Sequence, residues 1–340
     1  DWLDDLGLPQ PETIDDWTEM LTAFRDKKNA SAPLSFNAVA FSRGALVGAF
    51  GVTNNYYLDN GEIKFGPIEP GFKDFLITMN KWYSEKLLDN NIASITAKSI
   101  DSNILNGSSG ASEGSVGNGI GRLMASAPDD KFELRAVKYP VLNRGDKPQF
   151  GHYGVLVSTD SCAISANSEK KDAAAKFLDY GYSEKGRVLY NFGIEGESFN
   201  YVDGYPTYTD LIMKNPEGLS VSAAMARYLI AYSVGPMVQD KRYMEQYAAL
   251  PSQKEAITIW SDTDADKHML PNLSIKSEET AEFAKVQNAV DTYRDEMMFK
   301  FILGTEPISK FDEYVEQIKA LGIEKNIAMY QDALARYNNR

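Results

Sequence analysis

Residues 151–199 constrain the fold more than any other part of this 340-residue chain. The segment opens with an apolar, β-rich run at residues 153–164, which predicts a strand. Ser168 and the acidic residues beside it then provide the N-cap and first turn of a helix whose apolar stripe includes Phe177. Gly181 is a helix stop. We therefore expect the strand to turn directly into an amphipathic helix.

A second short helix is expected from Ser183, and it leads into a glycine-rich loop at residues 193–196. The loop continues to Pro206 with aromatic rings, amides and carboxylates, and it contains no pairing of a nucleophile with a base. Irregular loops held by rigid helices commonly carry binding residues. This loop is therefore typical of a surface for a small polar ligand.

Local signals predict further elements. Thr13, followed by two aspartates, is an N-cap for a helix in the first thirty residues. The dipeptide at residues 60–61 is Asn-Gly, which favours a two-residue hairpin because both positions tolerate positive φ. Residues 134–141 read as a strand, and Gly304 ends a long helix that begins near residue 280.

The charge and composition exclude several function classes. The net charge of −13 argues against a nucleic-acid partner, and no run of lysine or arginine suggests an anionic membrane surface. The lone cysteine, Cys162, cannot form an internal disulfide, and two distant histidines cannot make a zinc motif. We therefore assign no metal-binding residue and expect no cofactor, while a structural metal is left open. No apolar stretch is long enough to span a bilayer, and the start at Asp1 suggests a fragment or a processed form.

Four segments together resemble one known family. Residues 164–180 read ISANSEKKDAAAKFLDY, and Ser-x-x-Gly follows at residues 183–186. Residues 2–17 read WLDDLGLPQPETIDDW, residues 51–83 begin GVTNNYYLDNGEIKFGPIEPGF, and residues 300–337 carry KFILG, FDEYV and YQDALARY. The chain is similar to family 1 extracellular solute-binding proteins, the sugar-capturing components of ABC importers. Within that family it most resembles the long Gram-positive lipoprotein branch.

The resemblance implies an α/β class and a helix-rich, periplasmic-binding-protein-like type II fold with two lobes. The chain would be a fragment that lacks the start of the first lobe. Residues 1–150 would form the second lobe, and residues 151–275 the crossover and the returning part of the first lobe. Residues 276–340 would be C-terminal helices that pack on the second lobe.

The resemblance also implies a function without catalysis. The protein would be a monomeric, extracellular lipoprotein of a Gram-positive bacterium that holds an oligosaccharide or another sugar between its lobes and then docks on a membrane permease. A glycoside hydrolase with paired carboxylates is the alternative, but 48 acidic residues always allow some pair to be nominated. A structural module without a small ligand is a third possibility. No catalytic residue is assigned.

A glycine-rich segment at residues 107–122 leaves several interpretations open. It lacks the lysine of a phosphate-binding P-loop and the spacing of a dinucleotide fingerprint, so nucleotide binding is disfavoured. It could be a flexible linker. The resemblance favours a loop that faces the cleft between the lobes, where Glu113, Asn118 and Arg122 would contact a sugar.

The other candidate ligand-binding residues come from aromatic and polar positions along the chain. Tyr56, Tyr57 and Trp260 are candidates for stacking on sugar rings, because aromatic side chains present large apolar faces. Near the crossover and the loop that follows it, the candidates are His152, Tyr153, Glu195 and Tyr205.

Overall fold

The computed structural model describes residues 1–37, 44–152, 154, 162–231 and 235–339. These residues form two compact units, each built from separate stretches of the chain. Unit 1 contains Asp1–Glu113, Val137–Tyr153 and Thr258–Arg340, and unit 2 contains Gly114–Ala136 and Gly154–Ile257. The assignment of residue ranges to a first and a second lobe stays a prediction.

The N-terminal part of unit 1 begins with two helices, α1 (Trp2–Leu6) and α2 (Ile14–Lys27). The predicted cap of α2 is confirmed: the Asp16 amide donates to Thr13 Oγ1 at 3.1 Å, and the Thr13 amide donates to Asp16 Oδ2 at 2.9 Å. After α2 the chain enters β1 (Leu34–Ser35), which pairs in parallel with β4 (Ala111–Ser112). Helix α5 (Ala97–Leu105) packs against both strands.

The predicted Asn-Gly hairpin is confirmed. Strands β2 (Tyr56–Asp59) and β3 (Glu62–Phe65) are antiparallel, and Asn60 and Gly61 between them have φ of 50° and 86°. Two positive φ values match the right-handed twist of the strands that they join. Short 3-10 helices lie before and after the hairpin, η1 (Val47–Phe50) and η2 (Gly66–Ile68), and α4 (Pro70–Ser84) follows.

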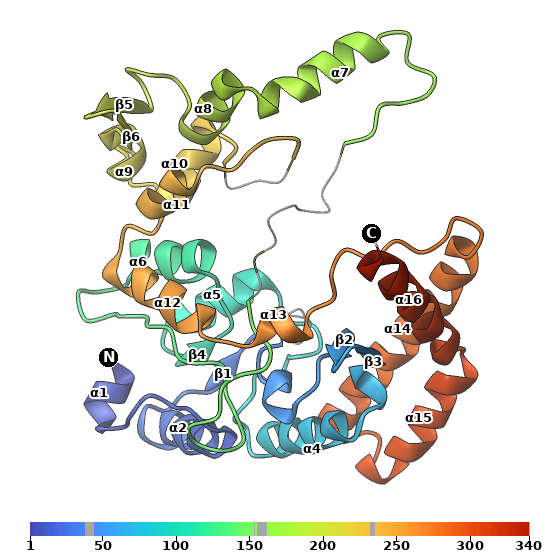
Figure 1. Cartoon of the computed structure of the whole chain (residues 1–340). Helices are drawn as coiled ribbons and strands as arrows, with labels where there is room; N and C mark the ends of the chain where they lie inside the picture. Colours follow the sequence, from blue (N-terminus) through green and yellow to red (C-terminus); the bar gives the residue numbers. More distant parts are fainter. Residues whose placement is uncertain (38–43, 153, 155–161, 232–234, 340) are drawn as a thin grey trace. The chain divides into compact units, whose positions relative to one another are not determined.

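C-terminal helices complete unit 1 (Figure 1). They are α13 (Ala265–His268), α14 (Thr280–Leu303), η5 (Ile308–Lys310), α15 (Phe311–Ala320) and α16 (Ile323–Asn338). Helix α14 packs along α4, and α16 packs on both α14 and β3. Gly304 ends α14 with φ of 72°, as predicted. The shared core includes the fully buried Trp82 and Tyr314, so segments more than 200 residues apart meet in one cluster.

Unit 2 is also dominated by helices. It contains a π-helix, η3 (Val116–Gly121), and α6 (Arg122–Ala125). The elements that follow are α7 (Lys171–Asp179), η4 (Tyr180–Tyr182), α8 (Glu184–Phe192), β5 (Phe199–Val202), β6 (Tyr205–Tyr208), α9 (Asp210–Met213), α10 (Val221–Tyr228), α11 (Lys241–Tyr247) and α12 (Pro251–Ser261), whose last turn belongs to unit 1. Strands β5 and β6 form an antiparallel hairpin beside α8 and α9 (Figure 1). A small core with Phe192, Phe199 and Tyr208 holds these elements together.

Two local predictions need correction. Residues 134–140 are not a strand, because no strand pairs along them in the described structure, and Val141 makes only an isolated bridge to Thr13. The helix expected from Ser168 begins at Lys171, and none of its residues is fully buried: Phe177 of the predicted apolar stripe is 70% exposed, while Ala174 and Leu178 are half-buried. The cap at Ser183 is confirmed, since Ser183 Oγ accepts from the Gly186 amide at 3.0 Å. The strand predicted at residues 153–164 lies mostly outside the described residues.

Candidate functional site

The two tyrosines expected to stack on sugars are part of the core of unit 1. The Tyr56 hydroxyl lies 2.7 Å from Gln287 Oε1, and its ring packs against Phe65 and edge-on against Tyr330. Burial raises the pKa of Tyr56. Tyr57 is 5% exposed and packs edge-to-face with Phe150. Because both rings are occupied by protein contacts, we leave them out of the proposed ligand site.

The other unit 1 candidates are His152, Trp260 and Glu113. His152 is exposed, and its amide donates to the Tyr139 hydroxyl at 3.1 Å. The Trp260 indole is half-buried, and Nε1 donates to the Val137 carbonyl at 3.1 Å. Glu113 is the last residue of its stretch in unit 1 and is half-buried. Tyr153 lies outside the described residues.

The glycine-rich segment forms a π-helix in place of the expected loop. Ser115 caps η3, since its Oγ accepts from the Asn118 amide at 3.2 Å and its carbonyl accepts from the Gly119 and Ile120 amides. Arg122 Nε donates to the Asn118 carbonyl at 3.0 Å, so two predicted site residues lie together on one short helical element. The Asn118 side chain is exposed. π-Helical turns frequently occur at functional sites.

Side chains from α11 and α12 pack against the glycines of this π-helix. A Cβ atom on Gly117 would lie 1.4 Å from the Tyr247 hydroxyl oxygen, and one on Gly121 would lie 2.5 Å from Gln253 Nε2. The same Gln253 nitrogen donates to the Val116 carbonyl at 2.8 Å. A larger residue at either position would displace the end of the Tyr247 or Gln253 side chain, which come from α11 and α12.

The other unit 2 candidates lie around the β5–β6 hairpin. Glu195 is exposed in the loop before β5. The Tyr205 hydroxyl donates to Glu245 Oε2 at 2.5 Å. Burial and this bond to a carboxylate raise the pKa of Tyr205 to about 12. Within unit 2, the described residues bring together Asn118 on η3 and Arg122 at the start of α6, while Glu195 and Tyr205 belong to the hairpin region.

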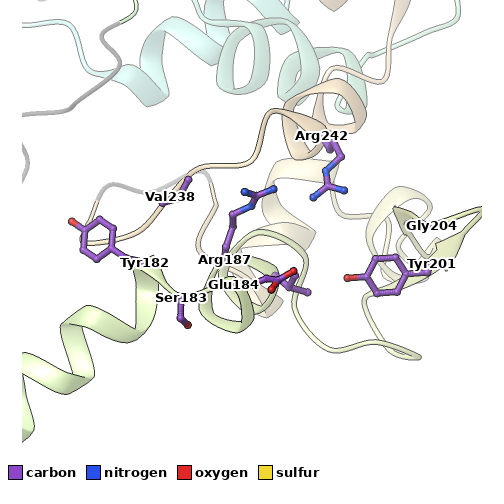
Figure 2. Close-up of a pocket in the computed structure, with 9 residues that line it drawn as sticks. Tyr182, Ser183, Glu184, Arg187, Tyr201, Gly204, Val238 and Arg242 are labelled. Atoms are coloured by element: carbon purple, nitrogen blue, oxygen red, sulfur yellow. The ribbon is translucent and has the colours of Figure 1, made fainter.

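A polar pocket that sequence reasoning missed lies in unit 2, between α8, the β5–β6 hairpin and the start of α11 (Figure 2). We call it the arginine pocket. Its volume is about 560 Å³, and its lining includes Tyr182, Glu184, Arg187, Tyr201, Val238 and Arg242. A signal for it exists in the sequence Asp240-Lys241-Arg242, where an acidic N-cap precedes a basic residue. Arg187, the other arginine that Asp240 binds, lies 53 positions before Asp240 in the sequence.

Asp240 organises the arginine pocket. Its side chain is 4% exposed and accepts from both guanidinium groups, with Arg187 Nε at 3.0 Å and Nη2 at 2.9 Å, and Arg242 Nε at 2.9 Å and Nη2 at 2.6 Å. The Asp240 amide donates to Asn191 Oδ1 at 2.8 Å, which ties the turn to α8. Hydrogen bonds from Arg242, opposed by burial, lower the pKa of Asp240 to about 2. Both arginines are therefore fixed in direction.

The described residues offer no metal centre, since no group of three or more His, Cys, Asp or Glu side chains among them could hold an ion. No helix within the described ranges is long and apolar enough to cross a membrane.

Comparison with known proteins identifies the class. The chain belongs to the family described as bacterial extracellular solute-binding protein, whose model matches residues 1–188. This is a family of binding proteins and not of enzymes, so the prediction of a non-catalytic protein is confirmed at the level of the family. The expected extracellular or cell-surface location agrees with the family description.

Two curated relatives come from Bacillus subtilis (strain 168). Lipoprotein LipO is 22% identical over 95% of this chain and 65% of its own length. The polygalacturonan/rhamnogalacturonan-binding protein YtcQ is 24% identical over 98% of this chain and 66% of its own length. The chain thus spans just under two thirds of the length of these two relatives.

A solved structure shows the fold. The crystal structure of the alginate-binding protein AlgQ2 without calcium ion aligns with a TM-score of 0.78 and 23% identity, covering 98% of this chain and 70% of that chain. The predicted two-lobe, type II binding-protein fold is confirmed by this likeness.

Proposed function

We propose that this chain is the major part of the solute-binding component of an ABC importer, and that its ligand is an oligosaccharide. The match of the family model to residues 1–188 is the observation that carries this proposal. The relatives YtcQ and AlgQ2 support a carbohydrate, because each is named as a protein that binds a polymeric sugar. The name of LipO supports a lipid-anchored form at the cell surface.

Within the chain, we propose the π-helix η3 as one contact for that ligand. Its exposed Asn118 carries both donors and an acceptor, which suits sugar hydroxyl groups. The close packing of Tyr247 and Gln253 on the glycines holds the turn in place before a ligand arrives. Preformed contacts of this kind reduce the entropic cost of binding.

The test is a thermal-shift and calorimetry screen with the full-length protein against neutral oligosaccharides, such as maltotriose and raffinose, and acidic ones, such as trigalacturonate. A true ligand at about 100 times its Kd stabilises the folded state by about 2.7 kcal/mol. The same samples are checked for new reducing ends. Stabilisation without product supports a binding protein, whereas product formation or the absence of stabilisation by every sugar would contradict the proposal.

Asn118→Ala tests the contact on η3. We expect it to weaken oligosaccharide binding about tenfold without changing the melting temperature of the free protein, since Asn118 is exposed. Asn90→Ala, on an exposed turn of unit 1, is the matched control. Equal affinities of the two variants would remove η3 from the site.

The docking partner and the anchor are further parts of the proposal. We propose that the protein delivers its ligand to a membrane permease of an ABC importer and acts as a monomer. Co-purification of the full-length protein with a permease encoded beside its gene tests the partner, and the size of the purified protein in light scattering tests the monomer.

A further inference from the structure

We propose that the arginine pocket of unit 2 is a second binding site, which takes one uncharged sugar unit. All residues that line this pocket lie between Tyr182 and Arg242, so the site is complete within unit 2. The inference does not depend on where the oligosaccharide of the proposed function binds. It rests on the donors, acceptors and rings that the pocket presents.

The two arginines supply oriented donors. A guanidinium group carries five N–H donors. Arg187 and Arg242 each direct the Nε and Nη2 edge toward Asp240, at distances of 2.6 to 3.0 Å. The Nη1 group of each arginine has no hydrogen-bond partner within the described part of the chain, and both arginines line the pocket. The pocket therefore holds fixed donors that remain available.

Glu184 supplies the acceptor. It occupies the first turn of α8, and its carboxylate points toward the space between Arg187 and Tyr201 (Figure 2). It makes no hydrogen bond with any residue that the structure describes. A sugar hydroxyl donates and accepts at once, so neighbouring hydroxyls can bridge the carboxylate and a guanidinium.

Aromatic rings complete the lining. Tyr201 on β5 is 45% exposed, and Tyr182 in η4 is 57% exposed. Figure 2 shows the two rings on opposite sides of the charged groups. Exposed tyrosines that flank a polar hollow offer apolar faces for the C–H groups of a sugar ring.

The charge of the lining favours a neutral ligand over an anion. Arg187 and Arg242 contribute two positive charges, while Asp240 and Glu184 contribute two negative ones. A carboxylate ligand would meet arginines that Asp240 already neutralises in part, and it would also face Glu184. A volume of about 560 Å³ lies in the range for small-molecule sites.

Saturation-transfer NMR on the whole chain tests the proposal. The probes are methyl β-D-glucopyranoside, methyl α-D-mannopyranoside and sodium galacturonate, each titrated to a dissociation constant. We expect at least one neutral glycoside to bind, and we expect Tyr201→Ala and Glu184→Gln each to raise its Kd about tenfold. Tyr337→Ala, which removes a partly exposed tyrosine of α16 in unit 1, is the control and leaves the Kd unchanged.

Glu184→Gln changes one exposed side chain on α8, so it tests the site even if Tyr201→Ala disturbs the hairpin. The proposal is overturned if neither variant alters binding of the neutral glycosides, or if none of these glycosides binds. It is also overturned if galacturonate alone binds and Glu184→Gln tightens it, because the pocket would then be an anion site. Thermal stabilisation by an oligosaccharide, measured on the same variants, reports separately on the proposed function. Its persistence after loss of the glycoside signal shows two independent sites.

Discussion

Replacing Asp240 with asparagine removes the charge that holds Arg187 and Arg242, and we predict that it destabilises unit 2. Asp240 is 4% exposed, accepts three guanidinium hydrogen bonds, and has Arg187 Nη2 at 2.9 Å as a further ion-pair contact. Asparagine has nearly the same size as aspartate, but its NH₂ group is a donor and cannot accept hydrogen bonds from the arginine N–H groups. The variant therefore loses the ion pairs without leaving a cavity.

The magnitude follows from the pKa. The Asp240 pKa falls from its ordinary value of 3.8 to about 2, chiefly because of Arg242. At about 1.36 kcal/mol for each pKa unit, the charged carboxylate stabilises the folded state by about 2.5 kcal/mol. Partial exposure of both arginines screens the interaction, so we expect about 2 kcal/mol at pH 7.

The sign of the pH dependence is fixed by the lowered pKa. The stabilisation is present above pH 3.8, where the carboxylate is charged in both states, and it is lost as the pH falls toward about 2. The difference between the wild-type protein and Asp240→Asn should therefore shrink over this interval. Asp203→Asn, at an exposed turn with φ of 52°, is a matched control that should change stability little.

Two probes separate the units in a urea titration. All four tryptophans, Trp2, Trp17, Trp82 and Trp260, lie in unit 1, so their fluorescence reports on that unit. Far-UV circular dichroism reports on the helices of both units. We expect Asp240→Asn to shift the dichroism curve and to affect the fluorescence curve less. Equal stability of variant and wild type at pH 7, or a difference that persists unchanged to pH 2, would refute the reasoning.

Two further predictions concern packing. Gly117→Ala forces the Tyr247 ring to move, since a Cβ atom would lie 1.4 Å from the hydroxyl oxygen. Overpacking of this kind lowers the free energy of unfolding by about 1 to 3 kcal/mol, which circular dichroism in a urea titration measures. An unchanged urea midpoint would contradict the prediction, because it would show that the ring moves without cost. Trp82→Ala removes a fully buried indole that donates to Thr18 Oγ1 at 2.9 Å, and we expect a loss of about 3 to 5 kcal/mol in the unfolding of unit 1. The fluorescence of the remaining tryptophans follows that unfolding, and Ile77→Ala, at an exposed position of the same helix, should cost far less.

Turns and helix ends that depend on only a few neighbouring residues could be predicted from the sequence. The Asn60–Gly61 turn, the Thr13 cap and the Gly304 stop are set by backbone geometry and by hydrogen bonds to near neighbours, and each is confirmed. The strand predicted at residues 134–141 was wrong because a strand needs a partner, and Val141 finds only Thr13. Pairing is a long-range property that an apolar pattern does not contain.

The site was harder to predict for the same reason. Tyr56 was expected to stack on a sugar ring, but Gln287 and Tyr330, more than 200 positions away, contact it in the core of unit 1. Asp240 binds Arg187, which lies on helix α8. The sequence does not indicate which of the 48 acidic residues makes this ion pair. Asn118 and Arg122 could be assigned to one site because they are only four residues apart in the sequence, although the helical turn that joins them was not predicted.

The discontinuous make-up of the two units governs how the polypeptide can be cut and synthesised. The backbone changes unit at 113/114, 136/137, 153/154 and 257/258. If a protease cuts the backbone at one of these four positions, the two units stay covalently linked through the remaining three. Shortening the chain from one end therefore isolates neither unit. On the ribosome, unit 1 cannot complete its core until α14 (Thr280–Leu303) has emerged to pack on α4, so α4 must wait for a segment made about 200 residues later.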